Sequence, residues 1–215
     1  ALDPLEGTTI TAKAGPNALL VTANVTAMQG AVELADAISI DTILAAHQAL
    51  LDDHTYASPG QLRDQQVWIG STALSPHTAS FVPPHHSRVP AALDDLIAFV
   101  HRVDLPVLVQ VAIAHAQFET IHPFNDGNGR TGRTLVHAML RHSGVTRTLT
   151  VPVSAGLLTD TAAYFQALTD YREGYVETII GQFINASFRA IGNGRTLVDD
   201  LESVYEQWSE RLPAR

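Results

Sequence analysis

Residues 120–133 read Thr-Ile-His-Pro-Phe-Asn-Asp-Gly-Asn-Gly-Arg-Thr-Gly-Arg and separate two stretches with helical spacing of apolar residues. The first stretch, 106–121, ends there because Pro123 and the residue before it disfavour a continuing helix. Helical spacing returns over 128–142. This part of the sequence therefore predicts two consecutive helices joined by a glycine-rich loop, which lies at the N-terminus of the second helix.

The rest of the chain also has mainly helical patterning. Helices are predicted over 17–36, from Ser39 or Asp41 to about Leu51, over 91–103, from Thr159 or Asp160 to about Tyr171, and over 175–191 and 196–212. The exception is 58–90, where five prolines disfavour a helix and two short β-prone runs favour a small hairpin. We predict an all-α helical bundle with a β-hairpin flap at 66–84, forming a single domain over 1–215.

Composition excludes several classes of protein. The chain has 215 residues, of which 46% are apolar, a size suited to one well-packed domain, and it contains no run long enough to cross a bilayer. A formal net charge of −9, with one lysine, argues against a nucleic-acid surface. The absence of cysteine excludes disulfides, thiolate zinc sites and a thiol nucleophile. Ten histidines occur without metal-binding spacing, so we expect no dedicated histidine metal site.

The sequence begins at Ala1 rather than Met, so we expect a processed chain or part of a longer protein. We also expect the protein to be soluble and cytoplasmic, with no membrane partner.

The glycine-rich loop has the features of an anion site. The first backbone N–H groups of a helix lack partners, and the helix dipole is positive at that end. Gly127 and Gly129 lack Cβ atoms and let the backbone approach a phosphate closely. Arg130 and Arg133 are three residues apart on the first turn, so both guanidinium groups can reach the same polyphosphate.

Two more residues of the loop suit phosphate chemistry. Asp126 is out of place in an anion site unless a hard cation, such as Mg²⁺, joins its carboxylate to phosphate oxygens. His122 has a side chain that can accept a proton near neutral pH. Each of these residues taken alone is as well explained by ordinary turn chemistry, and Gly-Asn-Gly-Arg recurs at 192–195, where we interpret it as a turn between two helices.

The loop resembles the signature of the Fic family, commonly written HPFxDGNGRxxR. All its fixed positions are matched, by His122, Pro123, Phe124, Asp126, Gly127, Asn128, Gly129, Arg130 and Arg133. The resemblance extends to 114–121, to 164–168, and to 66–70 and 79–84, which are similar to the family's target-docking flap. It covers nearly the whole chain and implies a Fic-like helical bundle.

The resemblance implies a protein adenylyltransferase that transfers AMP from ATP to a Ser, Thr or Tyr hydroxyl of a target protein, with Mg²⁺ as cofactor, and releases pyrophosphate. By this resemblance His122 deprotonates the hydroxyl and Asp126 holds Mg²⁺. Asn128 and the loop amides steady the α-phosphate, and Arg130 and Arg133 bind the β- and γ-phosphates.

The same resemblance assigns further roles. Phe124 anchors the loop in the core. Tyr164 lines the adenosine pocket, or is a packed core aromatic. Ser80, Phe81 and Val82 pair with the backbone of the target by β-augmentation, or belong to an ordinary hairpin packed on the bundle. Similar Fic domains often form homodimers, so we expect one here.

Many Fic proteins also carry an inhibitory helix, in which a Glu followed by Gly or Asn pairs with the second arginine of the signature. Residues 5–8 look like the end of that helix, with Glu6 as the inhibitory residue. Leu2 stands where Ser or Thr is expected, and Pro4 disfavours a helix interior. Glu6 therefore either restrains Arg133 or is a solvated carboxylate.

Three functions remain open at this point. The first is AMP transfer. The second is a different reaction on the same fold, either removal of AMP or transfer of the γ-phosphate as in Doc-type proteins. The third is a nucleotide-dependent binding module without catalysis, against which the intact His122 counts.

Overall fold

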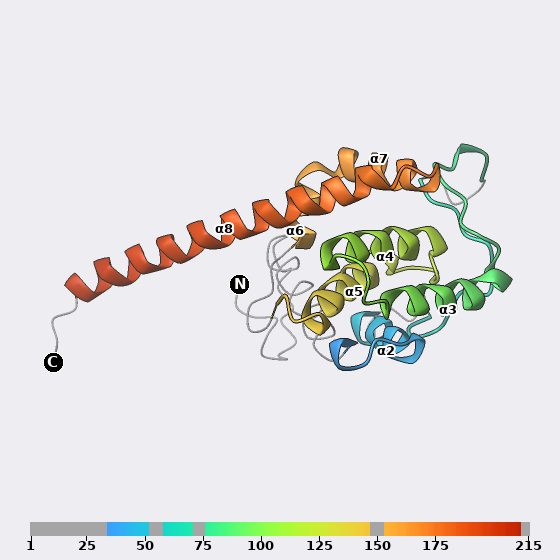
Figure 1. Cartoon of the computed structure of the whole chain (residues 1–215), viewed down its shortest axis with the longest axis horizontal. Coiled ribbons are helices and arrows are strands. Elements are labelled where there is room, and N and C mark those ends of the chain that lie inside the picture. Colours follow the sequence, from blue (N-terminus) through green and yellow to red (C-terminus); the bar gives the residue numbers. More distant parts are fainter. Residues whose placement is uncertain (1–33, 52–57, 71–75, 147–152, 212–215) are drawn as a thin grey trace, which may run out of the picture. The chain divides into compact units, whose positions relative to one another are not determined.

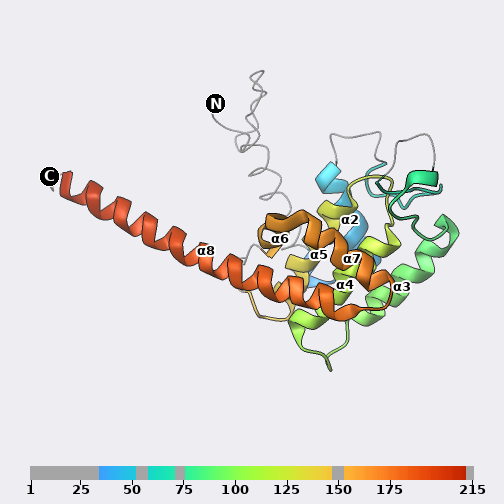
Figure 2. The same cartoon turned by 90° about the horizontal axis from the view of Figure 1, so that it is seen from above.

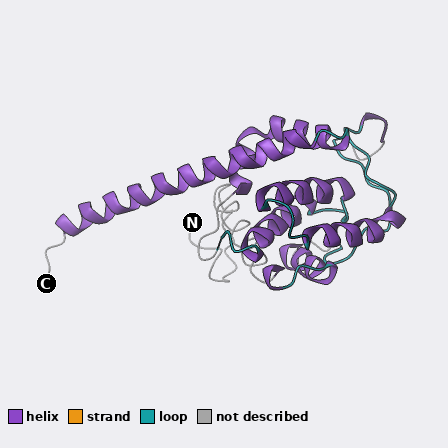
Figure 3. Cartoon of the chain, in the orientation of Figure 1, coloured by secondary structure: helices purple, strands orange, loops and turns teal. Residues whose placement is uncertain are grey.

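A computed structural model describes residues 34–51, 58–70, 76–146 and 153–211 (Figure 1). The chain divides into two compact units, Ala1–Arg147 and Thr148–Arg215. The described residues form helices and loops, and no β-strand is present among them (Figure 3). The all-α prediction is therefore confirmed. The single domain over 1–215 stays a prediction.

Four long helices form the described framework of the first unit. They are α2 (Ile40–Leu51), α3 (Val89–Val100), α4 (Val107–Ile121) and α5 (Asn128–His142). Helix α4 packs against α3 and α5, and α2 packs against α5; Figures 1 and 2 both show α4 and α5 side by side. Nine of the 15 residues of α4 are buried, as expected of a helix that is apolar around most of its circumference. This central pair of helices carries the glycine-rich loop.

The sequence predicts the ends of these helices well. Helix α5 spans the predicted 128–142, and Gly144 follows it with φ +76°, a conformation that suits glycine at a helix end. Helix α2 is capped by Ser39, whose Oγ accepts a hydrogen bond from the Thr42 N–H at 3.2 Å. Of the helix expected over 17–36, only 34–36 lie within the described residues, and these are helical.

The segment predicted as a hairpin flap forms a single antiparallel bridge between Ile69 and Phe81. The Ile69 N–H donates to the Phe81 carbonyl at 2.9 Å. The ladder ends nearby because Pro83 has no N–H, and the side chain of Gln66 donates to the Pro83 carbonyl at 2.7 Å instead. Residues 71–75, the predicted tip, lie outside the described residues.

The second unit contains α6 (Val153–Leu157), α7 (Thr161–Arg172) and α8 (Val176–Arg211). Helix α8 packs against α6 and α7, and its buried residues include Ile179, Phe183 and Ala186. Gly156 of α6 lies against the backbone of Ala186, where a Cβ has no room. Helix α7 is capped by Asp160, one of the two predicted caps, which accepts from the Ala163 N–H at 3.0 Å.

The predicted break between two helices at 192–195 is wrong, because α8 runs through it without interruption (Figure 1). Each glycine in a helix costs about 1 kcal/mol relative to alanine. Once a helix is nucleated, however, each further residue adds a hydrogen bond, so a long helix can absorb that cost. None of the described helices is long and apolar enough to cross a membrane.

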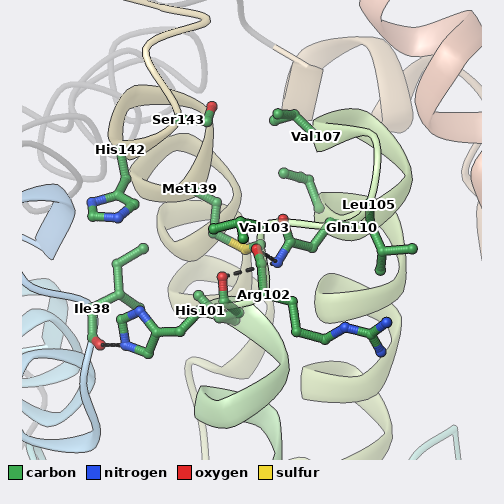
Figure 4. Close-up of a pocket in the computed structure, with 12 residues that line it drawn as sticks. Ile38, His101, Arg102, Val103, Leu105, Val107, Gln110, Met139, His142 and Ser143 are labelled. Atoms are coloured by element: carbon green, nitrogen blue, oxygen red, sulfur yellow. Dashed lines mark hydrogen bonds between the residues drawn. The ribbon is translucent and has the colours of Figure 1, made fainter.

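A pocket of about 320 Å³ opens at one end of the first unit (Figure 4). It is lined by residues near the start of α4, such as Val107 and Gln110, and near the end of α5, such as Met139 and His142. The loop that joins α4 to α5 lies at the other end of both helices. Because a 15-residue helix is about 22 Å long, the pocket is separate from the glycine-rich loop.

Candidate active site

His122 follows the last residue of α4 and adopts the left-handed conformation, with φ 49° and ψ 63°. Its N–H donates to the Phe118 carbonyl at 2.9 Å and closes the helix. A non-glycine residue in this region costs roughly 1–2 kcal/mol, and such strain persists where the surrounding structure imposes it. The candidate base therefore sits in a backbone conformation held by its neighbours.

The loop is anchored in the core by Phe124, as predicted. Its ring is 0% exposed and stacks on the ring of His47, with centroids 3.7 Å apart and planes inclined by 6°. The Phe118 ring lies 6.3 Å from it on the α4 side. The middle of the loop is thus fixed between α2 and α4.

His47, which the sequence analysis did not single out, also holds the loop by hydrogen bonds. The Gly60 N–H donates to its Nδ1 at 2.9 Å, so the ring proton lies on Nε2, which donates to the Asp126 carbonyl at 3.0 Å. Burial lowers the pKa of His47, which favours this neutral form. The residue is 79 positions from its loop partner, too far for a local sequence pattern to reveal.

Gly127 is the N-cap of α5 and adopts φ 78°. A Cβ at this position would lie 2.5 Å from the Cδ1 of Leu51, so both conformation and space require glycine. The Thr131 N–H makes the first hydrogen bond of the helix, to the Gly127 carbonyl at 3.0 Å. The amides of 128–130 therefore have no acceptor within the helix, which makes this end an anion site.

Asn128 makes hydrogen bonds within the loop, and its expected contact with the α-phosphate stays a prediction. Its side chain is buried, its Oδ1 accepts from the Phe124 N–H at 2.9 Å, and its Nδ2 donates to the Phe124 carbonyl at 2.9 Å. Both ends of the amide are thus engaged inside the loop. The side chain therefore fixes the shape of the loop, and its backbone amide is one of the donors at the start of α5.

The charged residues of the loop lie on the first turn of α5 and just before it. Arg130 Nη2 lies 3.6 Å from Asp126 Oδ2, and both side chains are partly exposed. A Cβ at Gly129 would lie 3.1 Å from Arg133 Nη1, so this glycine leaves room for the Arg133 guanidinium. Two guanidinium groups and the helix N-terminus outweigh one carboxylate, so the site favours a polyanion.

Asp126 is the residue that could hold a cation. Its Oδ1 accepts from the Gly127 N–H at 2.7 Å, and 46% of its side chain is exposed. Within the described ranges, no group of three or more His, Cys, Asp or Glu residues is suited to hold a metal ion alone. One exposed carboxylate beside a phosphate site fits the way Mg²⁺ is shared between a protein carboxylate and a nucleotide.

Polar side chains that the sequence analysis missed lie buried between α4 and α5. Burial lowers the pKa of both His115 and His137 to about 4, and the positive charge of Arg133 contributes to each shift. A Cβ at Gly132 would lie 2.8 Å from Glu119 Oε1, so the two helices approach closely here. The spacing of His115 and Glu119, four residues apart on one helix, is the signal that could have indicated such a cluster.

The remaining predicted site residues come from other segments of the chain. Tyr164 is buried in the second unit at 7% exposure, in tilted contact with Phe165, which agrees with a packed core aromatic. In the flap, Phe81 forms the bridge described above and Val82 is 48% exposed. Glu6 lies outside the described residues, so its pairing with Arg133 stays a prediction.

A histidine in a strained turn, together with the open N-terminus of a helix and two arginines on its first turn, is the arrangement expected of a helical phosphate-binding protein with a candidate base. Residues 37–140 match the model of the Fic/DOC family. This match, together with the relatives and solved structures below, supports a Fic-type domain in this chain.

Two relatives illustrate the similarity in sequence. The protein adenylyltransferase fic-1 of Caenorhabditis elegans is 27% identical over 192 residues, covering 83% of this chain and 35% of that protein. The protein adenylyltransferase Fic of Nematostella vectensis is 29% identical over 116 residues, covering 53% of this chain and 25% of that protein. The chain thus spans about a third or less of the length of these curated relatives.

Solved structures show the same fold. A Fic family protein from Desulfovibrio desulfuricans G20 superposes with a TM-score of 0.67 at 26% identity, over 84% of this chain and 55% of that chain. Fic-1 of Caenorhabditis elegans superposes with a TM-score of 0.57 at 25% identity, over 88% of this chain and 56% of that chain. The predicted Fic-like helical bundle is confirmed.

Proposed function

We propose that this chain is a protein adenylyltransferase, which transfers AMP from ATP to a hydroxyl group of a target protein. The observation that carries the proposal is the placement of His122 in a strained turn within the same loop whose other end is the anion-binding N-terminus of α5. The complete match to the Fic signature and the names of the relatives support AMP as the group transferred.

In this reaction His122 takes the proton of the target hydroxyl. The hydroxyl oxygen forms a bond to the α-phosphorus as the bond from that phosphorus to the β-phosphate oxygen breaks, and pyrophosphate leaves with the electron pair. The charge that develops on the phosphates is met by the amides of 128–130 and by Arg130 and Arg133. Asn128 acts indirectly, by keeping Phe124 and the loop in shape.

Asp126 is the proposed ligand for Mg²⁺ in the nucleotide complex. When bound, the ion neutralises negative charge on the phosphate oxygens. The position of Arg130, 3.6 Å from the Asp126 carboxylate, supports this role, because the same carboxylate can turn from the guanidinium to a cation.

Three further roles complete the proposal. Ser80, Phe81 and Val82 dock the target backbone, and the exposure of Val82 supports a contact surface. Glu6 restrains Arg133, so Glu6→Gly should increase automodification with ATP, and an unchanged rate would contradict that role. Tyr164 contributes to adenosine binding.

We also propose that the protein acts as a homodimer.

The test is incubation of the protein with a lysate and with ATP labelled at either the α- or the γ-phosphate. AMP transfer puts the α-label on protein, whereas a kinase puts the γ-label there. If protein carries no label from either form of ATP, the result supports a binding module. His122→Ala should reduce α-labelling by about 10²- to 10⁴-fold while ATP still binds. His142→Ala, at the other end of α5, is the matched control and should leave labelling unchanged. Persistent labelling by His122→Ala would rule out His122 as the base.

A further inference from the structure

Arg63 is a buried arginine between α2 and the flap, with 3% of its surface exposed. Neither ion pair found among the described residues involves it. The hydrogen bonds of its guanidinium go instead to four backbone carbonyls. Burying an arginine without an ion pair costs free energy. The carbonyls that it binds therefore indicate what this side chain does.

Two of these carbonyls belong to the end of α4. Arg63 Nε donates to the His122 carbonyl at 2.8 Å, and Nη2 donates to the Ile121 carbonyl at 3.4 Å. The backbone N–H of Arg63 also donates to the Pro123 carbonyl at 2.9 Å. Carbonyls at a helix C-terminus lack partners within the helix and carry the negative end of the dipole, so a guanidinium is well matched to them.

The other two carbonyls belong to the two sides of the flap. Arg63 Nη1 donates to the Gln65 carbonyl at 3.0 Å, and Nη2 donates to the Pro84 carbonyl at 2.5 Å. One planar side chain therefore holds the Ile121 and His122 carbonyls and both sides of the flap, and the backbone N–H of the same residue holds Pro123. A lysine has one flexible ammonium group and cannot reproduce donors fixed in several directions.

We propose that Arg63 is a positioning residue that fixes the backbone of His122 and the base of the flap as one unit, so that a docked target hydroxyl meets the base at the right place. The inference rests on the proposed function. Its consequence is specific, because Arg63 contacts the histidine side of the loop and the flap, whereas the proposed phosphate contacts lie at 128–133. Loss of Arg63 should therefore impair transfer more than it impairs ATP binding.

The experiment compares Arg63→Lys and Arg63→Met with Arg102→Lys and Arg102→Met. Arg102 is the matched control, since it is an exposed arginine at the far end of the unit, bonded to Asp104 at 2.6 Å and 2.9 Å. For both Arg63 variants we expect kcat for α-labelling to fall at least tenfold, the KM for the target to rise, and the Kd for ATP to stay within twofold. Both Arg102 variants should match the wild type.

An unchanged kcat in a folded Arg63 variant would overturn the proposal. So would an equal loss of kcat and ATP affinity, which indicates a general structural role. Arg63→Lys keeps the charge and the stem, and it provides the test if Arg63→Met does not fold.

Amide hydrogen exchange separates this proposal from the proposed function. In Arg63→Lys, exchange should accelerate together at 63–70, 80–84 and 118–124, and not in the Arg102 variants. If the wild type transfers no label, the adenylyltransferase proposal fails, and hydrogen exchange alone decides whether Arg63 couples the loop to the flap. Faster exchange only in the flap (63–70 and 80–84), or only around His122 (118–124), would contradict that coupling.

Discussion

The tetrapeptide Gly-Asn-Gly-Arg occurs twice in this chain, at 127–130 and at 192–195, with opposite structural outcomes. In the first copy, Gly127 adopts φ 78° and starts a helix, and Asn128 is 2% exposed. The second copy lies within α8, in the middle of an exposed helical stretch. The same four residues thus form the start of a helix in one place and the interior of a helix in the other.

The surroundings explain the difference. Before the first copy, Pro123 ends the preceding helix, and Leu51 and His47 close in on the position where Gly127 has no side chain. Around the second copy, no atom of the described residues outside the helix's own backbone lies within 4 Å of the Cβ positions of Gly192 or Gly194. A short motif therefore acquires a function only when tertiary contacts impose its conformation.

The largest expected difference is in the acid sensitivity of the two helices that contain the copies, α5 and α8. Burial, with the nearby charge of Arg133, lowers the pKa of His115 and His137 from 6.5 to about 4, so the unfolded chain binds more protons between these values. The free energy of unfolding should therefore fall as the pH drops from about 6.5 to about 4. The loss is several kcal/mol, since one pKa unit corresponds to about 1.4 kcal/mol.

No histidine occurs in α8, so protection of its amides should not follow this acid transition. Hydrogen exchange in a pH series, comparing α5 with α8, measures the effect. Parallel losses of protection in both helices would count against the buried histidines as the cause.

Alanine at the first glycine of each copy should give effects of opposite sign. Gly127→Ala forces a left-handed alanine, at roughly 1–2 kcal/mol, and crowds Leu51, at roughly 1–3 kcal/mol, so we expect a loss of about 2–5 kcal/mol. Gly192→Ala should instead stabilise the protein by up to about 1 kcal/mol, because alanine is the better helix former. Urea unfolding of the two variants provides the comparison, and effects of the same sign would refute it.

Alanine at Asn128 and at Asn193 should give the next largest difference in stability. Asn128→Ala leaves the N–H and the carbonyl of Phe124 buried without their partner, at roughly 1–3 kcal/mol for each group, so we expect a loss of about 2–6 kcal/mol. Asn193 is exposed, and Asn193→Ala should change stability by no more than about 0.5 kcal/mol. Thermal unfolding measures both. A small effect at Asn128 would mean that the loop keeps its shape without this amide.

The arginines provide the most direct functional contrast. Arg130→Met removes a charge-assisted bond to phosphate worth about 1.5–3 kcal/mol, so the Kd for ATP with Mg²⁺ should rise on the order of 10- to 100-fold. Arg195→Met is the matched change in the second copy and should leave the Kd unchanged. Titration calorimetry measures the Kd for ATP of both variants. Equal Kd values would mean that the nucleotide does not bind at Arg130.

Local patterns predicted much of this molecule. Pro123, the helical spacing on both sides of the loop and Gly144 were enough to predict α5 and the end of α4. The break wrongly predicted in α8 shows the limit of residue propensity, because two glycines did not stop a helix already extended on both sides.

The sequence could not reveal what holds the loop in shape. His47 and Arg63 contact residues 79 and 59 positions further along the chain, and neither belongs to a local motif. The engagement of Asn128 with Phe124 is local, yet its direction depends on the left-handed turn at Gly127. Contacts of this kind depend on how helices pack, which residue spacing does not encode.

The left-handed backbone at His122 lowers the stability of the fold at the position of the proposed base. Glycine suits that conformation best, and asparagine tolerates it better than most residues do, but neither side chain can accept the proton that the reaction requires. A change of His122 to either residue should therefore relieve the backbone strain and remove the proposed base. If the chain is the proposed adenylyltransferase, such a variant should remain a stable nucleotide-binding protein that no longer transfers AMP.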